Sequence, residues 1–194
     1  MRFRSPRLPG GRWTVRSLAV GAALLAAGAA ALVVPTTAGA EDVEAQAISH
    51  RVPFPCGQTW QGQTRTNHSP LRAIDFNRDG DFGDRVTASA AGTVVHRGKM
   101  DGTSYGRLVV VRHSNGTATY YAHLSEYRVQ HGEQVSKGET LGLVGGSGFP
   151  NTPGGFGSHL HYEQRTSYGG SSVPIKFNVR DVYYYGTRSY TSRC

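Results

Sequence analysis

Short apolar runs, each closed by a glycine or another turn residue, follow one another through most of the chain. In several of them apolar and polar residues alternate, which is the period of a β-strand with one buried face. Asn115-Gly116 separates two such runs, and Asn-Gly is the strongest short signal for a β-hairpin. We therefore predict strands over Leu71–Asn77, over Arg85–Arg97 as a pair around Ala91-Gly92, and over Arg107–His113 and Thr117–Leu124.

Glycines punctuate the segment that follows, Val129–Gly148. Short apolar steps alternate there with glycines, a spacing typical of tight turns in small β-barrels. The 26 glycines of the chain favour a β-rich domain, and no segment after residue 52 keeps a helical period. We expect a single all-β domain, mostly antiparallel and of the barrel-sandwich kind, over residues 53–194.

The first 40 residues have a different pattern. Five arginines and no acidic residue precede an apolar run, Leu18–Val34, which ends in Ala38-Gly39-Ala40. A basic head, an apolar middle and small residues at the end are the parts of a secretory signal peptide. We expect cleavage after Ala40, a polar lead-in over residues 41–52, and a secreted, cell-wall-associated protein. An uncleaved membrane anchor is the alternative, because the run approaches the length that spans a bilayer.

Charge changes the picture once this segment is set aside. The formal net charge is +8, but the five arginines of the first 40 residues leave only +3 for the rest. That excess does not indicate nucleic-acid binding and suits a secreted protein that meets anionic surfaces. We expect a monomer with no nucleic-acid partner and, after signal cleavage, no contact with a membrane.

The two cysteines, Cys56 and Cys194, lie near the two ends of the expected domain. An even number of cysteines in an exported protein favours a disulfide. The alternative is a free, catalytic Cys56 that works with His68.

The strongest candidate for chemistry is His159-Leu160-His161. Residues i and i+2 of a strand face the same way, so the two imidazoles can share a metal ion or divide into one ligand and one proton carrier. Glu163 continues this face, where it can orient an imidazole from behind. Taken alone, the pattern also fits two surface histidines.

Three more residues favour the metal interpretation. Asp75 lies between two apolar residues in AIDF, so its carboxylate points away from the core side and needs a partner. His68 lies seven residues earlier, and His123 belongs to a predicted strand, on the face of Tyr121. The other histidines lie in the lead-in or beside turns, and we expect them to be exposed: His50, His96, His113 and His131.

Five motifs follow one another across roughly residues 53–165. They are TNHSPLRAIDFN, VTASAAGTVVHRG, SYGRLVVVRHSNGTATYYAHL, VQHGEQVSKGETLGLVGGSG and SHLHYE. In this order they resemble the lysostaphin-type and beta-lytic zinc metallopeptidases, secreted endopeptidases of a small β-barrel-like fold that mostly cut peptide bonds in bacterial peptidoglycan. The resemblance implies one Zn²⁺ per molecule, held by His68, Asp75 and His161, with His123 and His159 as the catalytic pair. Peptidoglycan peptides are the substrate that it implies.

Two features depart from the commonest pattern of this family. The early His and Asp are seven residues apart rather than four, with Ser69-Pro70 between them, so a longer loop has to return His68 to the site. Tyr162 stands where Phe is usual, which adds a hydroxyl on the core side.

Three other interpretations remain. The acidic stretch Asp75–Asp84 matches the first half of a calcium-binding loop, but Val86 stands where a bidentate Glu is required, so we interpret it as a solvated turn. A non-catalytic cell-wall-binding or regulatory module of the same fold is disfavoured because all five site residues are present. A phosphohistidine carrier is disfavoured because export separates it from a cytoplasmic phosphate donor.

Overall fold

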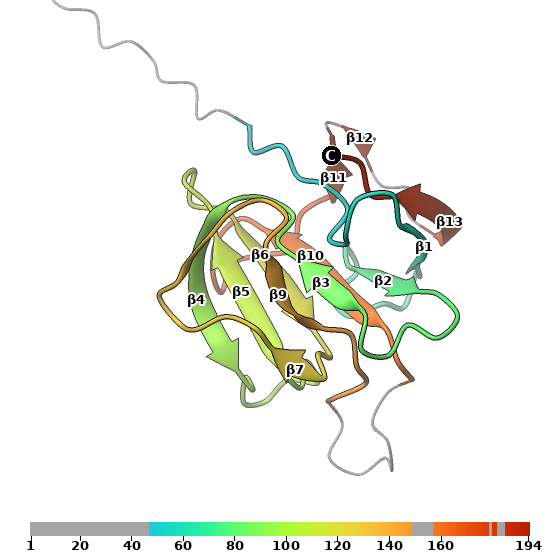
Figure 1. The fold of residues 1–194 in the computed structure, drawn as a ribbon, viewed down its shortest axis with the longest axis horizontal. Helices are drawn as coiled ribbons and strands as arrows, with labels where there is room; N and C mark the ends of the chain where they lie inside the picture. Colours follow the sequence, from blue (N-terminus) through green and yellow to red (C-terminus); the bar gives the residue numbers. More distant parts are fainter. Residues whose placement is uncertain (1–46, 149–156, 179, 182–184) are drawn as a thin grey trace, which may run out of the picture. The chain divides into compact units, whose positions relative to one another are not determined.

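The structure, a computed structural model, describes residues 47–148, 157–178, 180–181 and 185–194 (Figure 1). These residues belong to the compact unit Asp42–Cys194, and the predicted signal peptide lies outside them. All the regular structure in the described ranges is β-sheet with antiparallel pairing, which confirms the predicted all-β class. None of these ranges contains a helix with the length and apolarity needed to cross a membrane.

The strands form three sheets. The largest sheet has eight strands, and a three-stranded and a two-stranded sheet accompany it. The large sheet runs, from edge to edge, β13 (Gly186–Thr191), β1 (Thr59–Thr64), β2 (Ile74–Asn77), β10 (Leu160–Arg165), β6 (Ala118–Ala122), β5 (Leu108–Arg112), β4 (Gly92–Gly98) and β8 (Gln134–Val135). The small sheets are β3 (Arg85–Thr87), β9 (Thr140–Leu143) and β7 (Glu126–Tyr127), and β11 (Lys176–Phe177) with β12 (Arg180–Asp181).

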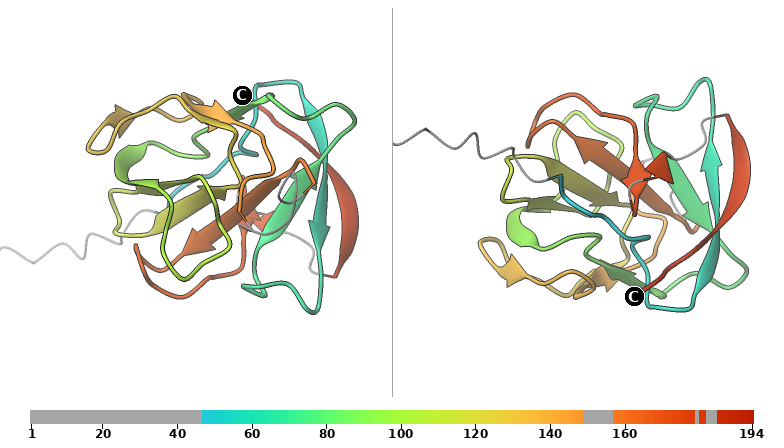
Figure 2. Two further views of the ribbon diagram at one scale, coloured as in Figure 1. Left: turned by 90° about the horizontal axis from the view of Figure 1, so that it is seen from below. Right: turned by 90° about the horizontal axis from the view of Figure 1, so that it is seen from above.

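The main core lies on one face of the large sheet, where β3 and β9 of the three-stranded sheet cover it (Figures 1 and 2). Val86 and Leu141 of the small sheet and Val111, Tyr121 and Tyr162 of the large sheet belong to one buried cluster. Neighbouring residues of a strand point to opposite faces, so the residues that alternate with these core residues along each strand of the large sheet point to the face of the sheet away from the main core. That face holds a smaller apolar cluster and the polar side chains described below.

The predicted strands are found, with shorter bounds. β5 and β6 form the hairpin on either side of Asn115-Gly116, and the predicted pair around Ala91-Gly92 divides into β3 and β4. The sequence did not predict β1. Its Trp60 is fully buried and stacks on Phe54 with ring centroids 3.7 Å apart, and the strand pairs with β13 on one side and β2 on the other.

Cys56 and Cys194 form a disulfide, as predicted, across a sequence separation of 138 residues. The hypothesis of a catalytic Cys56 is therefore wrong, because its sulfur is bonded to another sulfur. Ser192, just before the bridge, donates a hydrogen bond from its hydroxyl to the carbonyl of Phe54 at 2.7 Å. The bridge and this contact hold the last residues of the chain against the first part of the domain.

The prediction that His50 and His113 are exposed is wrong. Their exposed fractions are 7% and 3%, whereas His131 is exposed and His96 is intermediate. His50 Nδ1 lies 2.9 Å from the hydroxyl of Ser89, and its ring meets that of His113 edge-on at 5.0 Å. The lead-in therefore packs into the domain through a buried polar group, which its hydrophilic composition did not reveal.

This buried histidine predicts a pH-dependent loss of stability. Burial, the neighbouring His113 and the charge of Lys137 lower the pKa of His50 from 6.5 to about 3. Between these two pKa values the unfolded chain binds a proton that the folded chain excludes. The contribution of His50 to the free energy of unfolding is therefore fully present above about pH 6.5 and is lost as the pH decreases below it. His50→Gln keeps a hydrogen-bonding side chain without the titration. As the pH is lowered from 6 to 4, the unfolding free energy of this variant should decrease less steeply than that of the wild type. The difference between the two slopes should be about 1 kcal/mol per pH unit.

Urea unfolding of both proteins at several pH values measures this difference. The histidines that do not contact His50 are common to the two chains and cancel in the comparison, whereas His113 contacts His50, so the difference reports this pair. Equal slopes would show that His50 titrates alike in the folded and unfolded states.

Candidate metal centre

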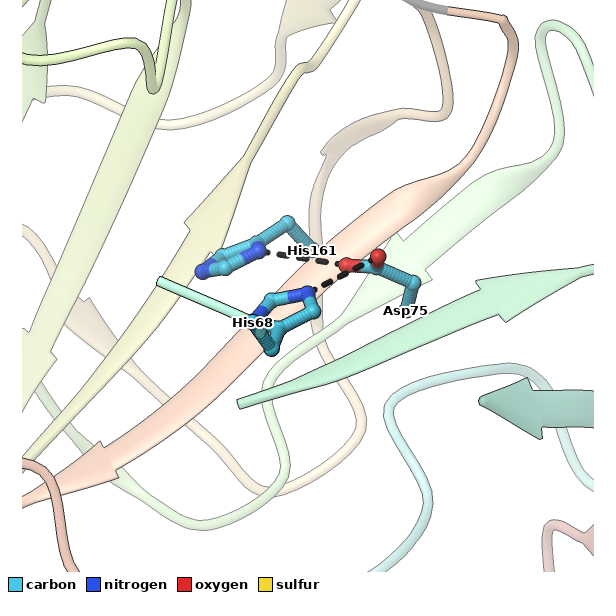
Figure 3. A group of neighbouring side chains, drawn as sticks. All are labelled: His68, Asp75 and His161. Atoms are coloured by element: carbon cyan, nitrogen blue, oxygen red, sulfur yellow. Dashed lines mark hydrogen bonds and ion pairs between the residues drawn. The ribbon is translucent and has the colours of Figure 1, made fainter. Parts of the chain in front are cut away.

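Three neighbouring strands of the large sheet bring the predicted site together. On β2, Asp75 lies directly opposite His161 of β10, and His161 lies opposite Ala122 at the end of β6. Ile74, Phe76, Leu160 and Tyr162 face the main core, so Asp75 and His161 share the opposite face. Their atoms meet there: His161 Nδ1 lies 3.2 Å from Asp75 Oδ1 (Figure 3).

His68 reaches the same place from the loop between β1 and β2. The backbone NH of His68 donates to the carbonyl of Arg65, and the NH of Ala73 donates to that of Pro70, so the loop turns twice within nine residues. These turns place His68 Nε2 2.9 Å from Asp75 Oδ2. The loop with the seven-residue spacing thus returns His68 beside Asp75, as predicted.

The three side chains meet the geometric requirement of a metal site. One potential ligand atom from each of His68, Asp75 and His161 lies within 4.8 Å of the other two, and all three residues are buried. Within the described residues no other group of three or more His, Cys, Asp and Glu side chains does so.

The hydrogen bonds behind the two imidazoles fix which nitrogens face the carboxylate. His68 Nδ1 lies 3.0 Å from the carbonyl of Pro70, and His161 Nε2 lies 2.8 Å from Glu163 Oε1, so each of these nitrogens carries a proton and donates it. The remaining nitrogens of neutral rings then direct lone pairs at an ionised carboxylate. Such an arrangement needs either an extra proton on each ring or a shared cation, and a Zn²⁺ ion with two N and one O ligand fits it.

The pKa values of His161 and Asp75 also indicate that the site favours a positive charge. Burial disfavours charge on His161, but its hydrogen bonds to Asp75 and Glu163 and their negative charges outweigh burial and raise its pKa to about 9. Burial would likewise raise the pKa of Asp75, but hydrogen bonds from His161 and His68 hold that pKa well below its usual range. The site therefore attracts positive charge strongly.

Glu163 lies behind His161, as the sequence predicted, and is itself held on three sides. Tyr105 donates from its hydroxyl to Glu163 Oε1 at 2.6 Å, and Arg165 donates from Nε to Oε2 at 2.6 Å. Burial raises the pKa of Glu163, but these contacts and the bond from His161 lower it overall. A carboxylate behind a ligating imidazole fixes the tautomer and makes the imidazole more basic.

His123 and His159 lie beside the three ligand candidates. Their ring centroids are 4.6 Å apart, and that of His123 is 5.7 Å from His161. His123 Nδ1 donates to the carbonyl of Ser147, and His159 Nδ1 donates to that of Gly157, both at 2.6 Å. In both rings Nε2 is therefore the nitrogen that can accept a proton.

Burial and the neighbouring His159 and His161 lower the pKa of His123 from 6.5 to about 3. It is therefore neutral near pH 7, with Nε2 unprotonated. His159 Nε2 lies 3.9 Å from Asp75 Oδ1, farther than either ligand candidate.

The prediction that His123 shares a face with Tyr121 is wrong. The strand ends at Ala122, and His123 adopts a left-handed backbone with φ of 62°, which turns its ring to the face opposite the core. Tyr121 belongs to the main core, where its hydroxyl bonds to Ser89. A single non-glycine residue with positive φ is uncommon and cannot be read from alternation.

One further correction and one confirmed prediction concern the surroundings of the site. Asp81 of the acidic turn is buried, with an exposed fraction of 5%, and accepts hydrogen bonds from the backbone of Arg78 and the hydroxyl of Ser158. It is therefore not a solvated turn residue. The hydroxyl of Tyr162 lies on the core side, as predicted, and donates to Ser89 at 2.9 Å.

One open cleft with a volume of about 460 Å³ is lined by the five site residues predicted from the sequence, His68, Asp75, His123, His159 and His161. Sequence reasoning missed Tyr105, which also lines it, and Arg65, whose guanidinium lies 2.7 Å from Asp75 Oδ2. No signal in the sequence marked Arg65, because its place follows from the pairing of β1 with β2, in which Gln63 lies opposite Asp75 and Arg65 follows two residues later.

An all-β domain with two imidazoles and a carboxylate converging in a cleft has the features of a metallopeptidase. The model of Peptidase family M23 matches residues 70–174, more than half of the chain. The chain belongs to this family of metallopeptidases, and membership implies a metal ion, typically zinc. Asp75, His123, His159 and His161 lie within the matched span, and His68 lies two residues before it.

Curated relatives match over shorter stretches. The chain is 43% identical over 83 residues to the DD-carboxypeptidase/endopeptidase Mpg of Neisseria meningitidis serogroup B, covering 43% of this chain and 17% of the relative. It is 41% identical over 70 residues to the peptidoglycan DD-endopeptidase ShyC of Vibrio cholerae serotype O1, covering 34% and 15%. The chain thus spans less than a fifth of the length of these relatives.

A solved structure supports the fold. The catalytic domain of a variant of the prophage-encoded M23 protein EnpA from Enterococcus faecalis is 23% identical and superimposes with a TM-score of 0.50. The match covers 63% of this chain and 92% of that domain.

Proposed function

We propose that the chain is a secreted zinc metalloendopeptidase that hydrolyses peptide bonds in the cross-links or stem peptides of bacterial peptidoglycan. The observation that carries the proposal is the convergence of His68, Asp75 and His161 within 4.8 Å, at a cleft shared with His123 and His159. Membership of the peptidase family and the resemblance to peptidoglycan DD-endopeptidases support the substrate class.

In this proposal His68 Nε2, His161 Nδ1 and the Asp75 carboxylate hold one Zn²⁺. A zinc ion held by these three residues would supply Lewis-acid chemistry: it would polarise a substrate carbonyl and lower the pKa of water to about 7. Glu163 and the carbonyl of Pro70 keep the two imidazoles in the tautomers that leave these nitrogens unprotonated. The buried setting of all three residues excludes competing water from behind the site.

His123 and His159 move protons in this proposal. The carbonyls of Ser147 and Gly157 hold their Nδ1 protons, so each ring offers Nε2 to the cleft. One neutral ring can take a proton from the attacking water, and the other can stabilise the oxyanion or protonate the departing amine. The Ser147 carbonyl is fixed in turn, because the Ser147 hydroxyl donates to the carbonyl of Leu124 at 2.8 Å.

Secretion is a separate part of the proposal. The basic head, the apolar run and Ala38-Gly39-Ala40 support removal of residues 1–40. Protein recovered outside the cells should begin at or near Glu41, and N-terminal sequencing measures this. Full-length protein starting at Met1 in the membrane fraction would contradict it and favour an anchor.

Hydrolysis is tested on purified peptidoglycan with residues 41–194 of the chain. Zinc-loaded protein should clear the suspension and release new amino termini, a chelator should stop both, and added zinc should restore them. Identification of the new amino termini gives the bond that is cut. Protein that binds the wall with zinc in place but releases no amino termini would favour the non-catalytic module instead.

A further inference from the structure

Arg65 is the one arginine or lysine among the described residues that line the cleft. Its guanidinium pairs with Asp75 Oδ2 at 2.7 Å, and a second nitrogen lies 3.3 Å from Gln63 Oε1. The side chain is still 47% exposed, whereas that of Asp75 is 7% exposed. A guanidinium has five N–H donors, so these two contacts leave donors that face the cleft.

The backbone holds Arg65 at this place. Gln63 lies in β1 and is the register partner of Asp75, and Arg65 directly follows the strand, which ends at Thr64. The carbonyl of Arg65 accepts a hydrogen bond from the backbone NH of His68. On the other side of β1, Trp60 is anchored in the main core. The guanidinium therefore extends from the residue that follows β1 and contacts Asp75, one of the three candidate metal ligands.

The surroundings of Arg65 are polar rather than apolar. The neutral polar side chains around the cleft are Gln63, Asn67, Ser69, Asn77, Ser104 and Ser158. Asp75 is already engaged by two imidazoles, so its charge is shared and does not fully neutralise Arg65. Such a cleft suits an extended polar peptide that carries a negative charge.

We infer that Arg65 binds a carboxylate of the substrate next to the bond that is cut. Guanidinium groups pair with carboxylates through two parallel hydrogen bonds, a geometry that a neutral amide cannot match. An extended peptide advances about 3.5 Å per residue, so a carboxylate on the residue after the bond can reach Arg65. The carboxylate is either the free α-carboxylate of a terminal residue or a side-chain carboxylate inside a cross-link. In the first case the chain trims terminal residues as well as cutting cross-links.

This inference rests on the proposed hydrolysis and is tested with two pairs of peptides. The first pair is a stem pentapeptide with a free C-terminal carboxylate and the same peptide as its C-terminal amide. The second pair is a cross-linked stem peptide with a free side-chain carboxylate after the bond and its amidated form. For at least one pair, kcat/KM of the wild type should favour the carboxylate roughly 10-fold to 100-fold, mostly through KM. The pair that shows the preference identifies the source of the carboxylate.

In Arg65→Gln the ratio of kcat/KM for the carboxylate form to kcat/KM for the amide form should be close to one, while the zinc content should equal that of the wild type. Arg65→Lys should restore part of it, because a lysine keeps the charge without the two-pronged geometry. The matched control is Arg85→Gln, which removes an exposed arginine of β3 that does not line the cleft.

Four outcomes would overturn the inference. The wild type could hydrolyse both members of each pair equally, which would leave the proposed function intact. Arg65→Gln could keep the preference, or it could lose zinc, in which case Arg65 acts by holding Asp75. Zinc-loaded wild type that hydrolyses none of the peptides and no peptidoglycan would contradict the proposed function as well.

Discussion

Asp75→Ala and His161→Ala should each abolish zinc binding and, with it, all measurable hydrolysis. Asp75 is the central group of the site, since its two oxygens lie 2.9 Å from His68 Nε2 and 3.2 Å from His161 Nδ1. Removing it leaves two imidazoles without the negative charge that attracts a cation. Removing His161 leaves Asp75 with one imidazole and removes one of two donors to Glu163 Oε1, the imidazole at 2.8 Å, while the hydroxyl of Tyr105 remains. Zinc per chain, measured by elemental analysis after dialysis, should fall from about one to near zero.

The matched control is Asp84→Ala, which removes a carboxylate that pairs with Arg78 at 2.7 Å and lies outside the cleft. It should keep zinc and activity. His68→Ala completes the series, because the family match begins after this residue. Full zinc content in His68→Ala would mean that another group is the third ligand, and full zinc content in Asp75→Ala would contradict the site as a whole.

His123→Ala should keep zinc and lose about 10²- to 10⁴-fold in kcat, the usual contribution of a general acid or base. Its ring lies beside the ligand candidates, with centroids 4.6 Å from His159 and 5.7 Å from His161, and the low pKa of about 3 keeps it neutral. Because its Nδ1 proton is held by the carbonyl of Ser147, the substitution removes a proton acceptor and leaves the ligand set intact. Steady-state kinetics with zinc content measured on the same samples tests this.

His131→Ala is the control, since His131 is exposed on a turn. An unchanged rate in His123→Ala, or the loss of its zinc, would contradict the assigned role. His159→Ala separates the two remaining possibilities. If it keeps zinc, the site has an open position. If it loses zinc, the ion has four protein ligands, which is the arrangement of a structural site.

The sequence predicted the fold class and the β5–β6 hairpin from local signals, and the disulfide from the number of cysteines. Alternation identifies the buried face of a strand, Asn115-Gly116 identifies the turn, and a chain with two cysteines has one possible intramolecular pairing. The shared face of His161 and Glu163 followed from the same period of two.

What the sequence could not predict depends on tertiary contacts. The burial of His50 requires Ser89 and His113, which are brought to it from elsewhere in the chain. The orientation of His123 depends on one left-handed residue at the end of a strand. Arg65 could be recognised as part of the site only after β1 was paired with β2, since that register places it on the face of Asp75.

The most direct test of the central claim is anomalous diffraction at the zinc edge from crystals of zinc-loaded protein. One strong anomalous peak is expected at ligand distance, about 2 Å, from His68 Nε2, His161 Nδ1 and a carboxylate oxygen of Asp75. His123 and His159 should lie near this peak without ligating it. A peak ligated by His159 as a fourth side chain, or a peak away from these three residues, would contradict a hydrolytic zinc site at this place.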